Sequence, residues 1–392
     1  MAGGAQFLDF AEAREQAKRF LPRALFDYID RGTEAETALN ALHDGFAARR
    51  IVPRVLRPVS APDLSARYLS AQHACPFVIA PTALAGMVRH DGEVLMARAA
   101  QQAGLPFVVA TQSSTSIEQI AANVPQSAIW FQLYVWQDRC ETWKLLDRVR
   151  ACGVETLVLT VDTPASPKKI HNRRNGFGVP LEPSATLALD LMRHPRWTLG
   201  VMGGYLMRNG FPSYAHYPGD VAKAVTEAIR DPRFALDTVL DQGFLKELRQ
   251  RWPHKLLVKG VLSATDAVEI FDAGCDGVVV SAHGGRNLDS AVLPLDVLPG
   301  IRDAVGPDRT LFADSGVRRG SDAAKLLAAG ADGVFLGRAP LYGLAASGVD
   351  GVVKMIEQFR EELRLFLGFA GAEDLSTLRQ AEWILKNACR KA

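Results

Sequence analysis

The segment from Gly277 to Asp289 places a histidine and an arginine directly after a run of β-branched residues. Such a run is typical of a buried parallel strand, which would hold His283 rigidly at its carboxyl end. An imidazole takes up and releases protons near neutral pH. The guanidinium of Arg286 can bind a carboxylate through two parallel hydrogen bonds. Together, the two side chains predict proton chemistry on a small organic acid.

Eight short β-rich runs alternate with amphipathic helical stretches from about residue 76 onward. Several of these stretches stop at a glycine, the usual helix stop signal; they include 93–103, 264–273 and 322–329. Eight strands with intervening helices predict an α/β fold, the (β/α)8 TIM barrel. A doubly wound open sheet is the alternative, which the lack of Gly-x-Gly-x-x-Gly after an early strand disfavours. The predicted strands are 76–80, 106–110, 129–135, 156–161, 256–259, 277–281, 310–313 and 333–336.

In such a barrel, functional side chains project from the carboxyl ends of the strands. Residues at six of the predicted strand ends, most of them polar or charged, should therefore meet: Gln132, Tyr134, Thr160, Asp162, Lys259, His283, Arg286, Asp314, Gly337 and Arg338. Loops after the last two strands commonly bind phosphate. Here these loops carry Gly316 with Arg318 and Gly337 with Arg338, which predicts a phosphate-bearing ligand.

The 392 residues, 48% of them hydrophobic, can bury a large core, and we expect one domain. Its predicted parts are an N-terminal helical cap (1–75), the barrel (76–177 and 251–350), a long insertion after strand 4 (178–250) and C-terminal helices (351–392). The insertion is rich in aromatic residues and has basic positions at Arg193, Arg196 and Arg208. It is either a lid or partner-docking segment over the barrel mouth, or a variable surface excursion.

The composition excludes several classes of protein. The net charge of +2 with 22% charged residues gives no indication of a nucleic-acid partner. Five scattered cysteines without Cys-x-x-Cys spacing argue against disulfides and a metal site, and they fit a reducing compartment. Neither a signal peptide nor a run of about 18 apolar residues is found. We expect a cytoplasmic protein, soluble or peripheral on the inner face of the membrane.

A series of motifs, in this order, resembles the FMN-dependent α-hydroxy-acid oxidase/dehydrogenase family, which includes glycolate oxidase, flavin-type lactate dehydrogenases and mandelate dehydrogenase. The resemblance spans residues 21 to about 378. Two stretches, 194–197 and 252–259, are most similar to the mandelate dehydrogenase group. The motifs are Phe26-Asp27-Tyr28, Ala80-Pro81-Thr82-Ala83, Phe131-Gln132-Leu133-Tyr134-Val135, Leu159-Thr160-Val161-Asp162-Thr163-Pro164, Val258-Lys259-Gly260, Ser281-Ala282-His283-Gly284-Gly285-Arg286 and Asp314-Ser315-Gly316-Val317-Arg318.

The resemblance implies oxidation of an (S)-2-hydroxy acid, mandelate-like or lactate, to the 2-oxo acid. His283 would remove a proton from the substrate, and Asp162 would pair with the imidazolium. Arg286 and the residue at position 169 would bind the substrate carboxylate, while Tyr28 and Tyr134 donate hydrogen bonds.

The resemblance also implies an FMN site. Gln132 and Thr160 would bond the flavin ring, and Lys259 would stabilise negative charge on it. The other residues implied in cofactor binding are Pro81, Thr82, Ala83 and Ala110 at the ring, and Ser281, Asp314, Ser315, Gly316, Arg318, Gly337 and Arg338, several of them at the ribityl chain and phosphate.

Three positions depart from the family pattern. Lys169 stands where a second carboxylate-binding arginine is usual, and lysine lacks the two-pronged geometry. Ala282 replaces the asparagine that usually precedes the histidine. Ala110 replaces a serine, although Thr111 follows it. The identity of the substrate therefore cannot be inferred from the substrate of a relative.

Several readings of the function stay open. Electrons would leave to oxygen, a quinone or a redox protein, and the insertion could contact a membrane surface. The family resemblance implies a homotetramer. The alternatives are a non-redox phosphate-binding barrel enzyme, such as an isomerase, and an FMN-binding protein with altered or lost turnover.

Overall fold

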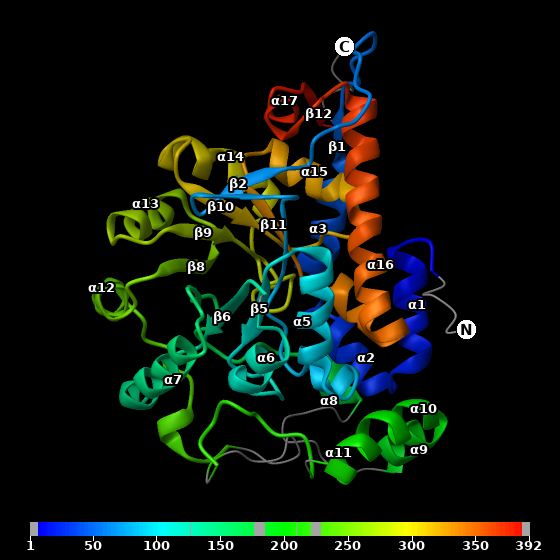
Figure 1. The fold of residues 1–392 in the computed structure, drawn as a ribbon, viewed down its shortest axis with the longest axis vertical. Helices are drawn as coiled ribbons and strands as arrows, with labels where there is room; N and C mark the ends of the chain where they lie inside the picture. The colour runs from blue at the N-terminus through cyan, green and yellow to red at the C-terminus, as the bar shows by residue number, and fades with distance from the viewer. Residues whose placement is uncertain are drawn as a thin grey trace.

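Eight parallel strands close into a barrel at the centre of the molecule (Figure 1). This computed structural model describes residues 7–125, 127–175, 185–208, 210–219, 221 and 229–385. The strands follow one another around the barrel in chain order, which confirms the predicted TIM barrel. They are β4 (Phe77–Ile79), β5 (Phe107–Ala110), β6 (Ile129–Leu133), β7 (Thr156–Thr160), β8 (Lys255–Val261), β9 (Gly277–Val280), β10 (Thr310–Ala313) and β11 (Gly333–Leu336).

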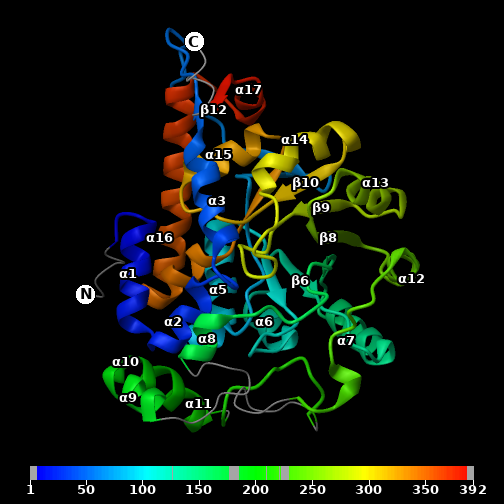
Figure 2. The same ribbon diagram turned by 180° about the vertical axis from the view of Figure 1, so that it is seen from behind.

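Helices alternate with these strands and surround the barrel (Figures 1 and 2). Several begin with a side chain that accepts a hydrogen bond from the first turn, as Asp138, Asp241 and Ser263 do. The helices expected at 93–103, 264–273 and 322–329 are present as α5 (Gly92–Ala103), α13 (Ala264–Asp272) and α15 (Gly320–Ala328). The helices around the barrel are α4 (Ala85–Val88), α5 (Gly92–Ala103), α6 (Ile117–Asn123), α7 (Arg139–Ala151), α12 (Gln242–Arg251), α13 (Ala264–Asp272), α14 (Pro294–Val305), α15 (Gly320–Ala328) and α16 (Arg338–Ala370).

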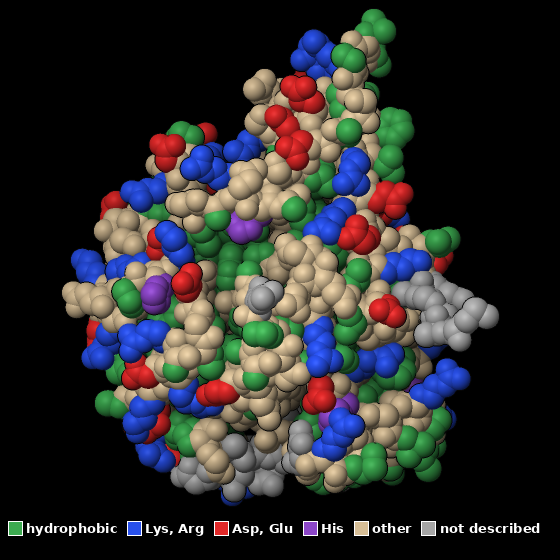
Figure 3. Space-filling view, viewed as in Figure 1, with side chains coloured by type: hydrophobic (Ala, Val, Ile, Leu, Met, Phe, Trp, Pro, Cys, Tyr) green, Lys and Arg blue, Asp and Glu red, His purple; other side chains and the backbone are tan. Residues whose placement is uncertain are grey.

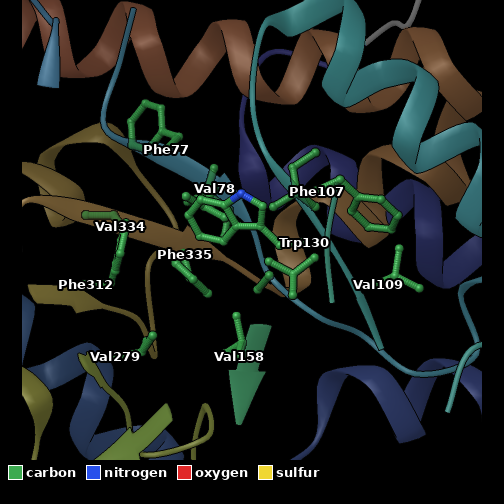
Figure 4. Packing of buried hydrophobic residues seen from close by; sticks show 14 of the residues in the cluster. Phe77, Val78, Phe107, Val109, Trp130, Val158, Val279, Phe312, Val334 and Phe335 are labelled. Atoms are coloured by element: carbon green, nitrogen blue, oxygen red, sulfur yellow. The ribbon is translucent and has the colours of Figure 1, made fainter. Parts of the chain in front are cut away.

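Aromatic side chains fill the barrel interior (Figure 4). Trp130, Phe312 and Phe335 lie with ring centres 5.2–6.1 Å apart. Tyr68, from the hairpin β2 (Ala66–Tyr68) and β3 (Ala71–His73), packs against Phe312 at 5.0 Å. Leu69 of the same hairpin donates its N–H to the hydroxyl of Thr310, the first residue of β10. The hairpin thus covers the amino-terminal end of the strands, and the carboxyl end is left for a site.

The N-terminal helices are α1 (Phe10–Phe20), α2 (Arg23–Asp30) and α3 (Thr37–Ala48). Helix α1 packs along α16, where the ring of Phe10 contacts that of Tyr342 at 5.4 Å. After α3, β1 (Arg49–Ile51) pairs with β12 (Trp383–Leu385), which follows α17 (Leu375–Arg379). The N-terminal segment is therefore attached to the last helices of the chain.

The segment between β7 and α12 is only partly described: residues 176–184, 209, 220 and 222–228 lie outside the described residues. Its described helices α9 to α11 form a small group beside α2 and α8 (Figures 1 and 2). The described elements of the whole segment are α8 (Ile170–Arg174), α9 (Ala185–Arg193), α10 (Pro195–Trp197), a π-helical turn (Thr198–Met202), α11 (Gly203–Arg208) and a 3-10 turn (Pro232–Phe234). Trp197 anchors the group, because its indole N–H donates to the carbonyl of Met87.

Candidate active site

A cavity of about 500 Å³ lies at the carboxyl ends of the strands. It is lined by nearly all the residues that the sequence indicates: Tyr28, Pro81, Thr82, Ala83, Ala110, Gln132, Tyr134, Thr160, Lys169, Lys259, His283, Arg286, Asp314, Ser315, Gly316, Arg318, Gly337 and Arg338. The remaining two, Asp162 and Ser281, hydrogen-bond to lining residues. The structure therefore brings together groups that are more than 300 positions apart in the chain.

A carboxylate and an imidazole form a pair at this cavity. Nδ1 of His283 lies 2.9 Å and 3.1 Å from the two carboxylate oxygens of Asp162. Burial opposes ionisation of Asp162, but His283 and Lys259 outweigh it and lower the pKa of the carboxyl group. Burial also lowers the pKa of His283, although Asp162 counteracts this effect. Near neutral pH the pair is thus a carboxylate beside a neutral imidazole.

The backbone around this pair is tightly constrained. His283 itself has a φ of +51°, in the left-handed region that non-glycine residues rarely adopt. Gly285, at φ +71°, passes so close to α3 that a Cβ would lie 2.8 Å from backbone atoms of Leu39. The turn is fixed by Ser315, whose Oγ accepts hydrogen bonds from the N–H groups of Ala282 and Gly284. The histidine therefore has little freedom to move.

Two basic side chains lie close to the ring of Tyr28. The guanidinium carbon of Arg286 lies 5.1 Å from the ring centre, and Nζ of Lys169 lies 5.0 Å from it. Nη1 of Arg286 donates to the backbone carbonyl of Tyr28 at 2.7 Å, which orients the guanidinium. Burial, with a contribution from Arg286, lowers the pKa of Lys169 to about 7. This part of the cavity offers positive charge to an anion.

Lys259 is buried at the cavity, and the carboxylate of Asp314 balances its positive charge. Its Nζ lies 3.3 Å from Oδ2 of Asp314 and donates to the hydroxyl of Ser281 at 2.9 Å. Burial favours the neutral amine, but Asp314 and Asp162 outweigh it and raise the pKa of Lys259. The lysine thus presents a permanent cation at the barrel end.

Several buried polar atoms at the cavity have no hydrogen-bond partner among the described residues. They include Nε2 of Gln132 and the hydroxyl groups of Thr82 and Thr160. Unpaired buried groups are costly, so their persistence at one cavity indicates a polar ligand. Thr111, next to Ala110, does not replace the usual serine, because its hydroxyl bonds the carbonyl of Gln132 and the N–H of Tyr134.

The far end of the cavity lies between the loop after β10 and the start of α16. Here Gly316 and Arg318 line it together with Arg338. The guanidinium of Arg338 is engaged: it donates to the backbone carbonyls of Ile29, Gly284 and Arg31 at 3.0, 2.9 and 3.3 Å. The two loops that the sequence associates with phosphate thus meet at one place.

Three polar residues at this end were missed by the sequence reasoning: Asp30, His43 and Tyr342. The carboxylate of Asp30 pairs with Arg14 and accepts a hydrogen bond from the hydroxyl of Tyr342 at 2.7 Å. Asn287 was missed as well; its Nδ2 donates to the carbonyl of Asp162 at 2.7 Å. Asp30, His43 and Tyr342 lie on helices, so the strand-end rule could not find them. Asn287 directly follows Arg286 in the loop after β9, and its position there was the signal that could have found it.

Comparison with known proteins agrees with this geometry. The family model of FMN-dependent dehydrogenases matches residues 17–385. The (S)-mandelate dehydrogenase of Pseudomonas putida is 37% identical over 365 residues, which cover 93% of this chain and 91% of that protein. A putative L-lactate dehydrogenase of Mycobacterium tuberculosis is 36% identical, over 94% of this chain and 88% of the relative.

Solved structures are similar over almost their whole length. A monotopic membrane protein, (S)-mandelate dehydrogenase, superimposes with a TM-score of 0.89 and 36% identity, covering 95% of this chain and 98% of that one. A mandelate oxidase variant with (S)-mandelic acid gives a TM-score of 0.81 and 30% identity, covering 97% and 99%. The match over most of the chain confirms the resemblance found in the motifs: this protein belongs to the FMN-dependent dehydrogenase family.

Proposed function

We propose that this protein oxidises an (S)-2-hydroxy acid to the corresponding 2-oxo acid, with FMN held in the cavity at the carboxyl ends of the strands. One observation carries the proposal. The imidazole–carboxylate pair of His283 and Asp162 opens onto the same cavity as the two basic side chains beside Tyr28, Arg286 and Lys169. A base and a carboxylate-binding site are what the removal of a proton from a hydroxy acid requires.

The residues of the cavity fit FMN, the cofactor of the family. The unpaired atoms of Gln132 and Thr160 match the polar edge of a flavin ring, and Lys259 supplies a cation beside it. Thr82 with its neighbours Pro81 and Ala83, and Ala110, would pack against the ring. When bound, FMN accepts the two electrons that leave the substrate. The residues that would hold the rest of the cofactor are Ser281, Asp314, Ser315, Gly316, Arg318, Gly337 and Arg338.

The chain's own residues then handle the proton. Because Nδ1–H of His283 donates to Asp162, the lone pair of the ring resides on Nε2, and this atom takes the substrate proton. The lowered pKa of His283 keeps it unprotonated before substrate binds. Asp162 stabilises the imidazolium that forms. General base catalysis of this kind contributes roughly 10²–10⁴-fold.

The substrate carboxylate would bind between Arg286 and Lys169, with the hydroxyl groups of Tyr28 and Tyr134 donating to the substrate. We propose an aryl or other bulky hydroxy acid, supported by the mandelate-acting relatives and by apolar lining residues such as Ala165, Pro167 and Leu236. Lactate is the second candidate, because several relatives are named L-lactate dehydrogenases.

Anaerobic reduction of the bound flavin tests the proposal. Addition of (S)-mandelate or L-lactate to the purified yellow protein should bleach the flavin absorbance, and His283→Ala should keep the colour but lose the bleaching. A flavin that stays oxidised with mandelate, lactate and glycolate would instead indicate an FMN-binding protein without this turnover. A protein that binds no FMN would favour a non-redox barrel enzyme.

We further propose that helices α9 to α11 contact a membrane surface, on the cytoplasmic side. Large apolar side chains are exposed there, and Figure 3 shows hydrophobic atoms gathered over this group at the lower right. These side chains are Leu189, Met192, Leu199, Leu206, Met207 and Phe211. Arg193, Arg196 and Arg208 in the same segment suit anionic headgroups. Among the described helices, none combines the length and apolar character needed to cross a bilayer.

Such a position would give the reduced flavin access to a membrane quinone; a soluble redox protein or oxygen are the other acceptors. Vesicles of anionic phospholipid should co-sediment with the protein, and Met192→Ser with Met207→Ser should weaken this binding. Unchanged sedimentation of the double variant would argue against a membrane-binding surface on helices α9 to α11.

From the family resemblance, we also infer a single catalytic domain that assembles as a homotetramer. Light scattering would test the oligomeric state.

A further inference from the structure

His43 lies at the far end of the cavity and has no role in the mechanism above. It shares this end with Arg318 and Arg338. Its Nε2 is buried and has no hydrogen-bond partner among the residues that the structure describes. A buried nitrogen without a partner, beside two arginines, is the same signal that Gln132 and Thr160 give at the other end.

Close packing fixes helix α3 in the position that places His43 at the far end of the cavity. At Gly285, the backbone passes against Leu39 of this helix. At Gly316, whose φ is +85°, a Cβ would lie 2.9 Å from Cβ of Leu42. Lys325 also donates to the carbonyl of Phe46, near the end of α3, at 2.8 Å. The helix that carries His43 is therefore packed against the loops after β9 and β10, and His43 lines the cavity beside them.

The charges around His43 favour an anion. Burial and the positive charges of Arg318 and Arg338 lower its pKa to about 4, and the carboxylate of Asp30 opposes them. Asp30 is itself neutralised, because it pairs with Arg14 and accepts from the hydroxyl of Tyr342. Since Arg338 already donates to three backbone carbonyls, a phosphate at this end needs further donors.

We propose that His43 is a phosphate-binding residue of the FMN site, donating a hydrogen bond from Nε2 to the phosphate of the cofactor. The inference rests on the FMN binding in the proposed function. A phosphate monoester carries a charge of about −1.5 to −2 near pH 7, so its arrival would reverse the local potential and favour the protonated imidazole. FMN binding by the wild type should therefore strengthen as the pH falls from 8 to 6.

Titration of the flavin-free full-length chain with FMN and with riboflavin tests the assignment, because the two ligands differ only in the phosphate. We expect His43→Ala to raise the dissociation constant of FMN about tenfold to a hundredfold, the range for a hydrogen bond to a charged group. The riboflavin constant should stay within about twofold. His43→Arg should restore FMN affinity and abolish its pH dependence between 6 and 8. Asn40→Ala, at an exposed position of the same helix, is the matched control.

Equal weakening of FMN and riboflavin by His43→Ala would overturn the inference, because it would indicate a loss of packing instead of a lost phosphate contact. Unchanged FMN affinity of His43→Ala would overturn it as well. A wild-type protein that binds riboflavin and FMN equally well would exclude any phosphate site here. Failure of the wild type to bind either flavin would overturn the proposed function itself, which separates the two failures.

Discussion

Nδ1 of His283, in the loop after β9, lies 2.9 Å from Oδ1 of Asp162, in the loop after β7, and strand β8 lies between these two strands. The contact joins two residues 121 positions apart. It fixes the tautomer of the imidazole and leaves Nε2 as the basic atom. The basicity of His283 therefore depends on the charge of the Asp162 carboxylate, and the pH dependence of kcat/KM can measure this effect.

Asp162→Asn should lower kcat/KM and shift its pH dependence. The carboxylate raises the pKa of His283 against the effect of burial, so its removal should lower that pKa further. The acid limb of the kcat/KM profile reports protonation of the free enzyme's base, and it should move to lower pH. We expect a loss of about tenfold to a hundredfold in kcat/KM from the weaker base. An acid limb that stays in place would show that His283 does not set it.

Lys169 should make substrate binding sensitive to pH near 7. Burial and Arg286 lower its pKa to about 7, so the amine is protonated below that pH and loses its charge above it. KM for a hydroxy acid should accordingly rise as the pH increases from 6.5 to 8.5, with kcat changing less. Lys169→Arg should remove the rise, because arginine stays charged, while Lys169→Met should raise KM at every pH. A rise in KM that persists in Lys169→Arg would assign the effect to another group.

His216 should make the fold sensitive to acid. The residue is fully buried: its Nε2 accepts from the N–H of Ile117, and its Nδ1 donates to the carbonyl of Thr111. Burial lowers its pKa to about 4, below the value of about 6.5 expected in the unfolded chain. The unfolded state therefore binds the proton first as pH falls, and stability on the order of 3 kcal/mol is lost between pH 6.5 and 4.

Thermal unfolding across this pH range checks the effect. The wild-type midpoint should fall with acid more steeply than that of His216→Gln, which cannot titrate. The variant's midpoint should lie lower at pH 7.5, because a tightly packed ring is lost. Parallel curves for the two proteins would mean that other groups cause the acid loss.

Gly285→Ala should destabilise the site more than backbone strain alone predicts. Its Cβ would lie 2.8 Å from backbone atoms of Leu39, in addition to the cost of about 1–2 kcal/mol for a left-handed alanine. Gly153→Ala is a matched control: its φ is +77°, and among the described residues no atom other than those of its chain neighbours lies within 4 Å of the added carbon. We expect a lower melting temperature and weaker FMN retention for Gly285→Ala than for Gly153→Ala. Equal effects in the two variants would refute the close approach of α3.

The sequence alone was enough for the barrel and for the cavity residues that follow the barrel strands. Runs such as Gly277–Val280 are apolar on both faces, which is typical of a parallel strand covered by helices. Once the strands are known, the geometry of a closed barrel brings their carboxyl ends together, so Lys259, His283 and Asp314 must be neighbours. Their positions follow from a local pattern and a general rule.

Other features were decided only by the tertiary structure. The amphipathic pattern of α3 indicates which of its faces is buried, but not which loops it meets, so His43 could not be assigned to the cavity. The same holds for Asp30, whose partners Arg14 and Tyr342 lie on α1 and α16. The lowered pKa values of Lys169 and His216 depend on burial and on charges brought close by folding, and no spacing in the chain encodes either.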